Sequence, residues 1–140
     1  GPCRPGAWGM RFTWAGTGKA TAFLLADAPF DVLRESNGDV MLVLTLRPET
    51  APQAEVNLGV ACGEGCAAAV PLRDTLAALP KEQWTTLGVP LKCFGAAGAD
   101  LTKLNQPMRL ETAGALQFSL SRVALGAINE ADHVFKCAKP

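Results

Sequence analysis

Two stretches of regular alternation between apolar and other side chains constrain the fold of this chain more than any other feature. In residues 40–47 every even-numbered position is Val or Leu, whereas the odd-numbered ones, from Met41 to Arg47, are expected to face water. In residues 55–62 the even-numbered positions are again apolar. A period of two is that of a strand with one face in a core and the other in solvent. The chain is therefore expected to form sheets with one solvated face.

Further strands are predicted where short apolar runs are bounded by Gly, Pro, Asn or Asp. The predicted strands are residues 10–14, 21–25, 40–47, 55–62, 85–90, 108–112 and 116–125. Helical signal is limited to residues 72–79, between two prolines, and to a turn at 100–104 with Asp100 as its N-cap. No repeat or linker interrupts the chain. We expect a single all-β sandwich domain over 1–140 with one or two short helical turns, ending in a polar tail, 129–140, that is extended or partly disordered.

The charge balance limits the classes of partner. Thirteen Lys and Arg residues offset thirteen Asp and Glu residues, so the net charge is zero. Without a basic excess, nucleic acid and membrane surfaces are not expected partners. No apolar run approaches the roughly 20 residues of a membrane-spanning helix. Five cysteines favour export to an oxidising compartment, with at least one thiol left unpaired within the chain.

The cysteines are better explained as disulfide partners than as metal ligands. Cys62 and Cys66 flank a glycine-rich turn, but Cys93 and His133 are a poor set of additional zinc ligands. Either a disulfide closes the small 62–66 loop, or one of its cysteines pairs with Cys93. Cys3 and Cys137 are a further candidate pair, because the termini of a domain often lie close together.

Aromatic and polar side chains supply the candidate binding site. Trp14 and Trp84 are predicted to lie in the core, whereas Trp8, in irregular chain between glycines, is the tryptophan expected to be exposed and able to stack on a sugar. The outward strand faces carry amide, carboxylate and guanidinium groups that match sugar hydroxyls, although an ordinary solvated face would look the same. These residues are Arg47, Glu55, Asn57, Gln117 and Ser119, with Arg11 and Thr13 adjoining.

Catalytic signals are weak. His133, the only histidine, lies in the tail, and no G-x-S-x-G turn accompanies it. The spacing of the acidic residues selects no pair for glycosidic chemistry. An independent hydrolase is therefore the third hypothesis, behind a binding module and an interaction module.

Several segments carry a resemblance to a known family. They are ESNGD (35–39) leading into 40–47, VNL (56–58) running to CGEGC (62–66), WTTLGVPLKCF (84–94) and AGADL (97–101). In this order they resemble the C-terminal galactose-binding-like domain of bacterial family 3 glycoside hydrolases of the exo-1,3/1,4-β-glucanase type. The resemblance extends from about Trp14 to Leu125, and residues 84–101 are its most specific part.

The resemblance implies a β-sandwich of jelly-roll type, excised from a larger, periplasmic or secreted bacterial enzyme that degrades polysaccharide. Nucleophile and acid/base belong to the catalytic core of such enzymes, so the resemblance places no catalytic residue here. It implies a noncatalytic accessory domain, although similarity of fold alone does not establish sugar binding. If the domain binds a β-linked polysaccharide or oligosaccharide, the outward residues Arg47, Asn57 and Glu55 are the leading contacts. The alternative is a structural module that docks on the parent's catalytic domains or mediates dimerisation. No cofactor is expected, and whether a structural calcium is bound, as in many galactose-binding-like folds, is left open.

Overall fold

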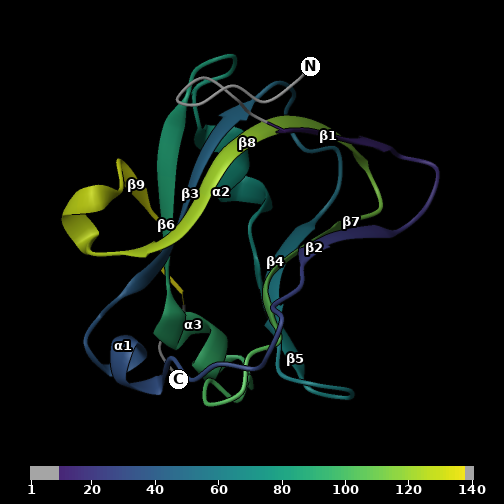
Figure 1. Cartoon of the computed structure of the whole chain (residues 1–140). Coiled ribbons are helices and arrows are strands. Elements are labelled where there is room, and N and C mark those ends of the chain that lie inside the picture. Colours follow the sequence, from purple (N-terminus) through teal and green to yellow (C-terminus); the bar gives the residue numbers. More distant parts are fainter. Residues whose placement is uncertain (1–9, 138–140) are drawn as a thin grey trace.

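Two β-sheets pack face to face in the computed structural model, which describes residues 10–137 (Figure 1). The five-stranded sheet has the order β1 (Met10–Ala15), β8 (Ala115–Gly126), β3 (Met41–Pro48), β6 (Thr85–Pro90) and β9 (His133–Val134). The four-stranded sheet has the order β2 (Ala20–Leu24), β7 (Gln106–Thr112), β4 (Val56–Ala61) and β5 (Ala67–Pro71). Neighbouring strands are antiparallel, apart from the parallel pair β6 and β9. The alternation of early and late strands across both sheets is that of a jelly roll, which confirms the all-β sandwich.

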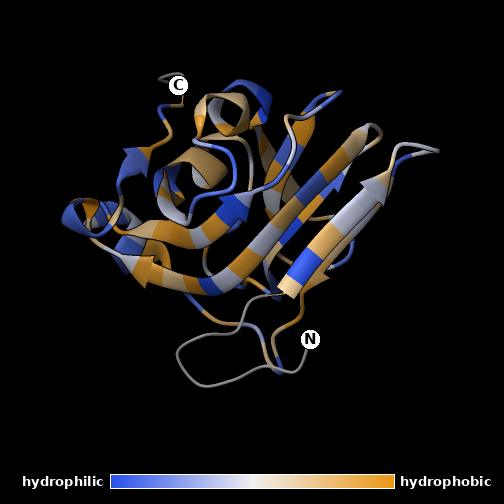
Figure 2. Cartoon of the chain, turned by 90° about the horizontal axis from the view of Figure 1, so that it is seen from above, coloured by the Kyte–Doolittle hydropathy of each residue, from blue (hydrophilic) through white to orange (hydrophobic). Residues whose placement is uncertain are grey.

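The core lies between the two sheets and is built by the period-two pattern. Leu42, Leu44 and Leu46 of β3 are at most 4% exposed, and Val56 and Leu58 of β4 are completely buried. Burying each such side chain contributes roughly 1.5–3 kcal/mol before conformational entropy is counted. Figure 2 shows the resulting alternation of apolar and polar residues along the strands. All seven predicted strands are present, with ends shifted by at most three residues.

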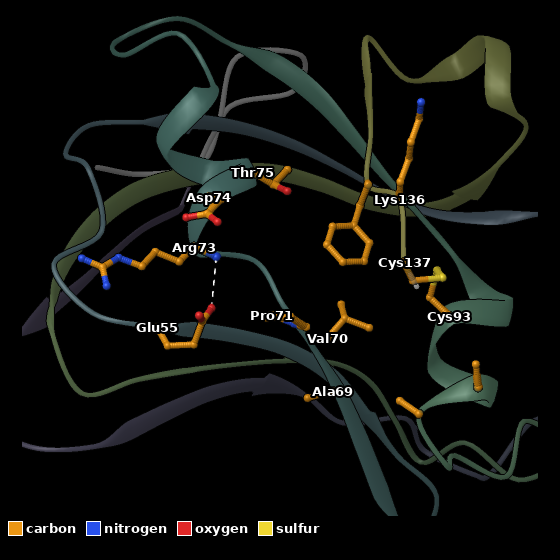
Figure 3. Close-up of a pocket in the computed structure, with 13 residues that line it drawn as sticks. Glu55, Ala69, Val70, Pro71, Arg73, Asp74, Thr75, Cys93, Lys136 and Cys137 are labelled. Atoms are coloured by element: carbon orange, nitrogen blue, oxygen red, sulfur yellow. Dashed lines mark hydrogen bonds between the residues drawn. A yellow bond between two sulfur atoms is a disulfide. The ribbon is translucent and has the colours of Figure 1, made fainter. Parts of the chain in front are cut away.

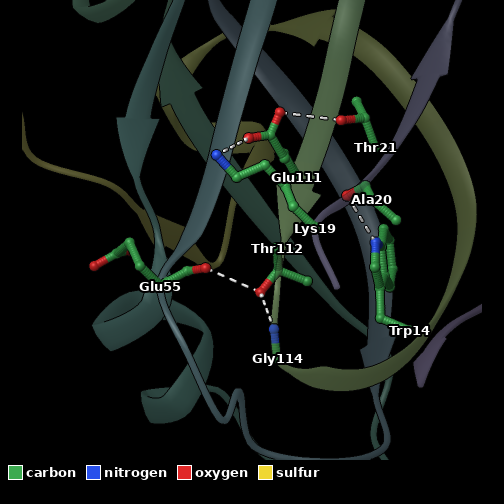
Figure 4. Close-up of polar contacts among 8 residues, drawn as sticks. All are labelled: Trp14, Lys19, Ala20, Thr21, Glu55, Glu111, Thr112 and Gly114. Carbon is green, nitrogen blue, oxygen red and sulfur yellow. Dashed lines mark hydrogen bonds and ion pairs between the residues drawn. The ribbon is translucent and has the colours of Figure 1, made fainter. Parts of the chain in front are cut away.

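Three aromatic rings fill one part of this core. Phe12, Trp14 and Phe118 stack with ring centroids 5.4–6.3 Å apart. The indole Nε1 of Trp14 donates a hydrogen bond of 3.1 Å to the carbonyl of Ala20, which joins β1 to the start of β2 (Figure 4). The prediction that Trp14 is a core residue is confirmed, because its polar atom finds a partner inside the sandwich.

The helices are short and lie between strands. The predicted helix near residues 72–79 is α2 (Arg73–Ala78), whereas α1 (Leu33–Asn37) and α3 (Leu91–Ala96) were not predicted. At Asp100 the chain makes a turn and no helix: the carboxylate accepts hydrogen bonds from the hydroxyl and the backbone N–H of Thr102, which lower the pKa of Asp100. Within residues 10–137, no helix is long and apolar enough to cross a membrane.

The outer side of β3 differs from the expectation. Met41 and Val43, predicted to face water, are 2% and 8% exposed. The chain that follows β8, including the 3₁₀ turn Ile128–Glu130, passes over this side, so that a Cβ placed on Gly126 would meet Val43 and Glu130. This central strand is therefore buried on both faces along its first half. Alternation predicts the two faces of a strand but not what covers them.

The C-terminal segment is also more ordered than expected. It forms β9 beside β6, buries Phe135 and ends the described chain at Cys137, which is bonded to Cys93 at the start of α3. The predicted Cys3–Cys137 pair is thus replaced by Cys93–Cys137, and Cys3 lies outside the described residues. The second disulfide, Cys62–Cys66, closes the glycine-rich turn, as one of the two alternatives proposed.

The two disulfides should differ in what they contribute to stability. Cys93–Cys137 spans 44 residues and Cys62–Cys66 spans four, so the chain-entropy model assigns them about 4 and about 2 kcal/mol. We expect Cys93→Ser/Cys137→Ser to lower the midpoint of urea unfolding more than Cys62→Ser/Cys66→Ser does. Equal midpoints for the two double variants would contradict the anchoring role of Cys137.

Candidate functional site

The polar residues predicted to form one site are divided between opposite faces of the sandwich. Arg47 and Gln117 lie on strands of the five-stranded sheet, whereas Glu55 and Asn57 belong to the chain that enters and forms β4 in the other sheet. Since both sheets bury their inner faces against each other, their outward side chains point in opposite directions. The prediction that Arg47, Glu55 and Asn57 share a sheet face is therefore wrong, because they belong to different sheets. Ligand binding has to be considered for each face separately.

On the five-stranded sheet the register gathers several predicted residues. Ser119 of β8 is paired with Arg11 of β1 on one side and with Arg47 of β3 on the other. Gln117 and Thr13 form the next pair. The Nε of Arg47 lies 3.3 Å from the carboxylate of Glu49, which holds the guanidinium over the sheet. The prediction that Arg11 and Thr13 adjoin this group of residues is thus confirmed.

Trp84 lies at the edge of this group, and its exposure contradicts a prediction. It was expected in the core but is 48% exposed. The next residue, Thr85, is buried and paired with Leu46, so alternation directs Trp84 outward, toward the side of the sheet that carries Arg47. An aromatic ring thus adjoins the polar group on β3. Trp8, the tryptophan predicted to be exposed, lies outside the described residues.

The four-stranded sheet carries a second polar group over a shallow hollow of about 230 Å³. Asn57 of β4 is paired with Glu111 of β7, and Gly59 is paired with Arg109. Glu111 and Arg109 were not singled out from the sequence. The signal was present, because they occupy the odd positions between Met108, Leu110 and Thr112 in a predicted strand.

Glu55 serves the fold. Its Oε1 accepts hydrogen bonds from the backbone N–H of Val56 at 3.1 Å and from that of Arg73, the first residue of α2, at 3.2 Å. Thr112 Oγ1 donates to the Glu55 carbonyl at 2.9 Å (Figure 4). Figure 3 shows the carboxylate on one wall of a hollow of about 520 Å³, opposite the Cys93–Cys137 disulfide. One of the two carboxylate oxygens of this side chain is therefore engaged within the protein.

Within residues 10–137, one side of the sandwich is apolar and open. Met10 and Phe12 of β1 and Leu24 of β2 line a cleft of about 360 Å³ together with Leu120 and Val123 of β8. Met10 is 53% exposed and Leu24 is 38% exposed. These side chains belong to the inner faces of the two sheets, at the edge where the sandwich is not closed. The cleft is a candidate contact surface for another protein.

The residues considered for catalysis and metal binding gain little support from the structure. His133 is half-buried in β9, paired with Leu87. Over residues 10–137, no group of three or more His, Cys, Asp or Glu side chains is placed to hold a metal ion.

Comparison with known proteins places this fold and its topology in a family. The model of the family Exop_C, described as galactose-binding domain-like, matches residues 8–125. The chain belongs to this family. No curated protein matches the sequence.

Two solved structures support the assignment of this galactose-binding domain-like chain. The extra C-terminal domain (X) of exo-1,3/1,4-β-glucanase (ExoP) from a Pseudoalteromonas species is similar with a TM-score of 0.71 and 23% identity, over 94% of this chain and 70% of that domain. The intact glucanase from the same organism gives a TM-score of 0.72 and 23% identity over 94% of this chain. The chain spans 16% of the length of that enzyme. At this identity the likeness shows a shared fold, and function is argued from the residues.

Glu55 should contribute to the stability of the fold. We expect Glu55→Ala to lower the free energy of unfolding by about 1 kcal/mol, because the backbone N–H groups of Val56 and Arg73 lose their acceptor. Glu64→Ala, in the exposed 63–65 turn, is the control and should change stability by less than about 0.5 kcal/mol. Equal urea midpoints for the two variants would contradict this role.

Proposed function

We propose that the chain is a noncatalytic accessory domain of an exported glycoside hydrolase active on β-glucan or xylan. Its similarity to a separate extra domain of a glucanase supports the accessory role. Its two disulfides fit an oxidising compartment. In this proposal the reacting carboxylates belong to the parent enzyme, and the domain covers residues 1–140 of the sequence given.

The domain is further proposed to bind β-linked polysaccharide or oligosaccharide, as carbohydrate-binding modules do. The observation that carries this proposal is the presence, on both outer sheet faces, of polar side chains next to an exposed aromatic ring. Trp84 accompanies Arg47 and Gln117 on one face, and Phe23, which is 52% exposed, accompanies Asn57 on the other. A sugar ring offers hydroxyls to the polar groups and an apolar C–H face to the aromatic ring.

A second candidate function is docking on the catalytic part of the same polypeptide. The open apolar side of the sandwich favours it, because Met10 and Leu24 are exposed there and a soluble domain that works alone gains nothing from such a cleft. The occupant would be an apolar ridge on the catalytic part. In that case the domain would be a wall or spacer that binds no sugar.

Affinity electrophoresis tests sugar binding directly. We expect the purified chain to migrate more slowly in gels that contain mixed-linkage glucan, laminarin or xylan than in plain gels, relative to a protein that does not bind glycans. Insoluble cellulose is tested by pull-down. Normal migration in all three gels, with no depletion by cellulose, would contradict the binding proposal and leave docking as the better candidate.

Sedimentation velocity tests the docking candidate. An uncovered apolar side should make the isolated chain associate as its concentration rises. Met10→Asp/Leu24→Asp should restore a monomer, because a buried carboxylate in the contact would cost several kcal/mol. The exposed pair Ala77→Asp/Ala78→Asp on α2 is the control. A wild-type chain that stays monomeric at every concentration would argue against docking through this cleft.

A further inference from the structure

We propose that the hollow on the four-stranded sheet is a subsite for a single pyranose ring, held by Arg109, Glu111 and Asn57. The inference rests on the proposed function, since it assumes that the domain binds glycan. It specifies the sheet face that binds, the residues that contact the sugar, and the length of sugar that the subsite holds, which is one ring. Arg109 and Glu111 have no role in the fold core, because they alternate with the buried Met108 and Leu110.

The strand register arranges the hollow in two adjacent rows across the sheet. One row contains Thr21, Glu111, Asn57 and Pro71, taken from β2, β7, β4 and β5 in order. The next row contains Phe23, Arg109, Gly59 and Ala69. Residues two apart on one strand are separated by roughly 7 Å, and adjacent strands by roughly 4.8 Å. The three polar groups therefore surround an area comparable to that of one sugar ring.

The floor of the hollow is made of positions with little or no side chain. Gly59 contributes no side chain to the hollow, and a Cβ there would clash with the Ala68 carbonyl oxygen of the neighbouring strand. Ala67, Ala68 and Ala69 of β5 complete the lining. A volume of about 230 Å³ falls below the range of roughly 300–1,000 Å³ typical of sites for drug-sized ligands. One ring fits this space, and an oligosaccharide would have to continue outside it.

The polar groups offer complementary hydrogen bonds. Glu111 is held in place, because its Oε2 accepts from the Thr21 hydroxyl at 3.1 Å and its Oε1 lies 3.5 Å from the Lys19 ammonium (Figure 4). Its remaining lone pairs can accept from sugar hydroxyls. Among the described residues, the side chains of Arg109 and Asn57 show neither a hydrogen bond nor an ion pair. They supply a fork of donors and an amide that donates and accepts, which suits adjacent hydroxyls.

The other face is less suited to the same task. Arg47 is already paired with Glu49 and is half-buried, so turning toward a ligand would cost part of that interaction. Five hollows on the described residues, including the one on the four-stranded sheet, are lined without Arg47, Gln117 or Trp84. On the four-stranded face, Phe23 stands beside Arg109 and can cover an apolar face of the sugar.

Isothermal titration with cellotriose, laminaritriose and xylotriose tests the subsite. Arg109→Ala removes the donors, and Ala69→Leu fills the hollow without deleting a polar group. We expect each to weaken binding of the preferred trisaccharide at least about tenfold. The matched controls are Arg34→Ala on α1 and Ala77→Leu on α2, which should bind within about twofold of the wild type. Unchanged circular dichroism and urea midpoints show that each variant is folded.

The outcomes separate the two proposals. If the wild type binds none of the trisaccharides and none of the polysaccharides, the proposal that the domain binds sugar fails. If the wild type binds and both Arg109→Ala and Ala69→Leu bind within twofold of it, the subsite is overturned while the function stands. Arg47→Ala then shows whether the five-stranded face is the binding surface.

Discussion

The packing of two apolar sheet faces against each other is the constraint on which the rest of this structure depends. Leu42 to Leu46 on one side and Val56 to Val60 on the other leave no freedom of register, because a slip by one residue would turn the core-facing side chains away from the opposite sheet. The same constraint fixes the outward side chains. Arg47, Asn57 and Arg109 face outward because their neighbours along each strand must be buried.

Much of this fold was predictable, because period two is a local signal. Seven of the nine strands in the described residues, the helix α2 and the outward direction of Arg47, Asn57 and Gln117 follow from the sequence, whereas β5 and β9 do not. Other features depend on distant contacts. The alanines of β5 have little strand propensity and are held by pairing with β4. Met41 and Val43 are covered by a segment much later in the chain, and Trp84 is exposed although tryptophans are usually buried.

The candidate site could be predicted only in part, for a topological reason. Alternation identifies which side chains point outward on a strand, but strand order decides which of two opposite faces they reach. Arg47 and Asn57 are close in sequence, yet the chain crosses from one sheet to the other between them. Glu55 was predicted to contact a ligand, and the structure adds that its Oε1 accepts the first backbone N–H of α2. Arg109 and Glu111 show the converse, since they were not predicted to bind, yet pairing of β7 with β4 brings them beside Asn57.

The oxidation state of Cys93 and Cys137 affects the stability of a region that extends well beyond these two residues. β9 is two residues long and could not hold its place by backbone pairing alone. Without the covalent link, the segment after β8 becomes the part that opens at the lowest free energy. Opening would uncover Met41 and Val43 on a central strand, which is a surface prone to aggregate. Chaperones and proteases would thus recognise a reduced chain as incompletely folded. Formation of the disulfide would complete the folding of the domain.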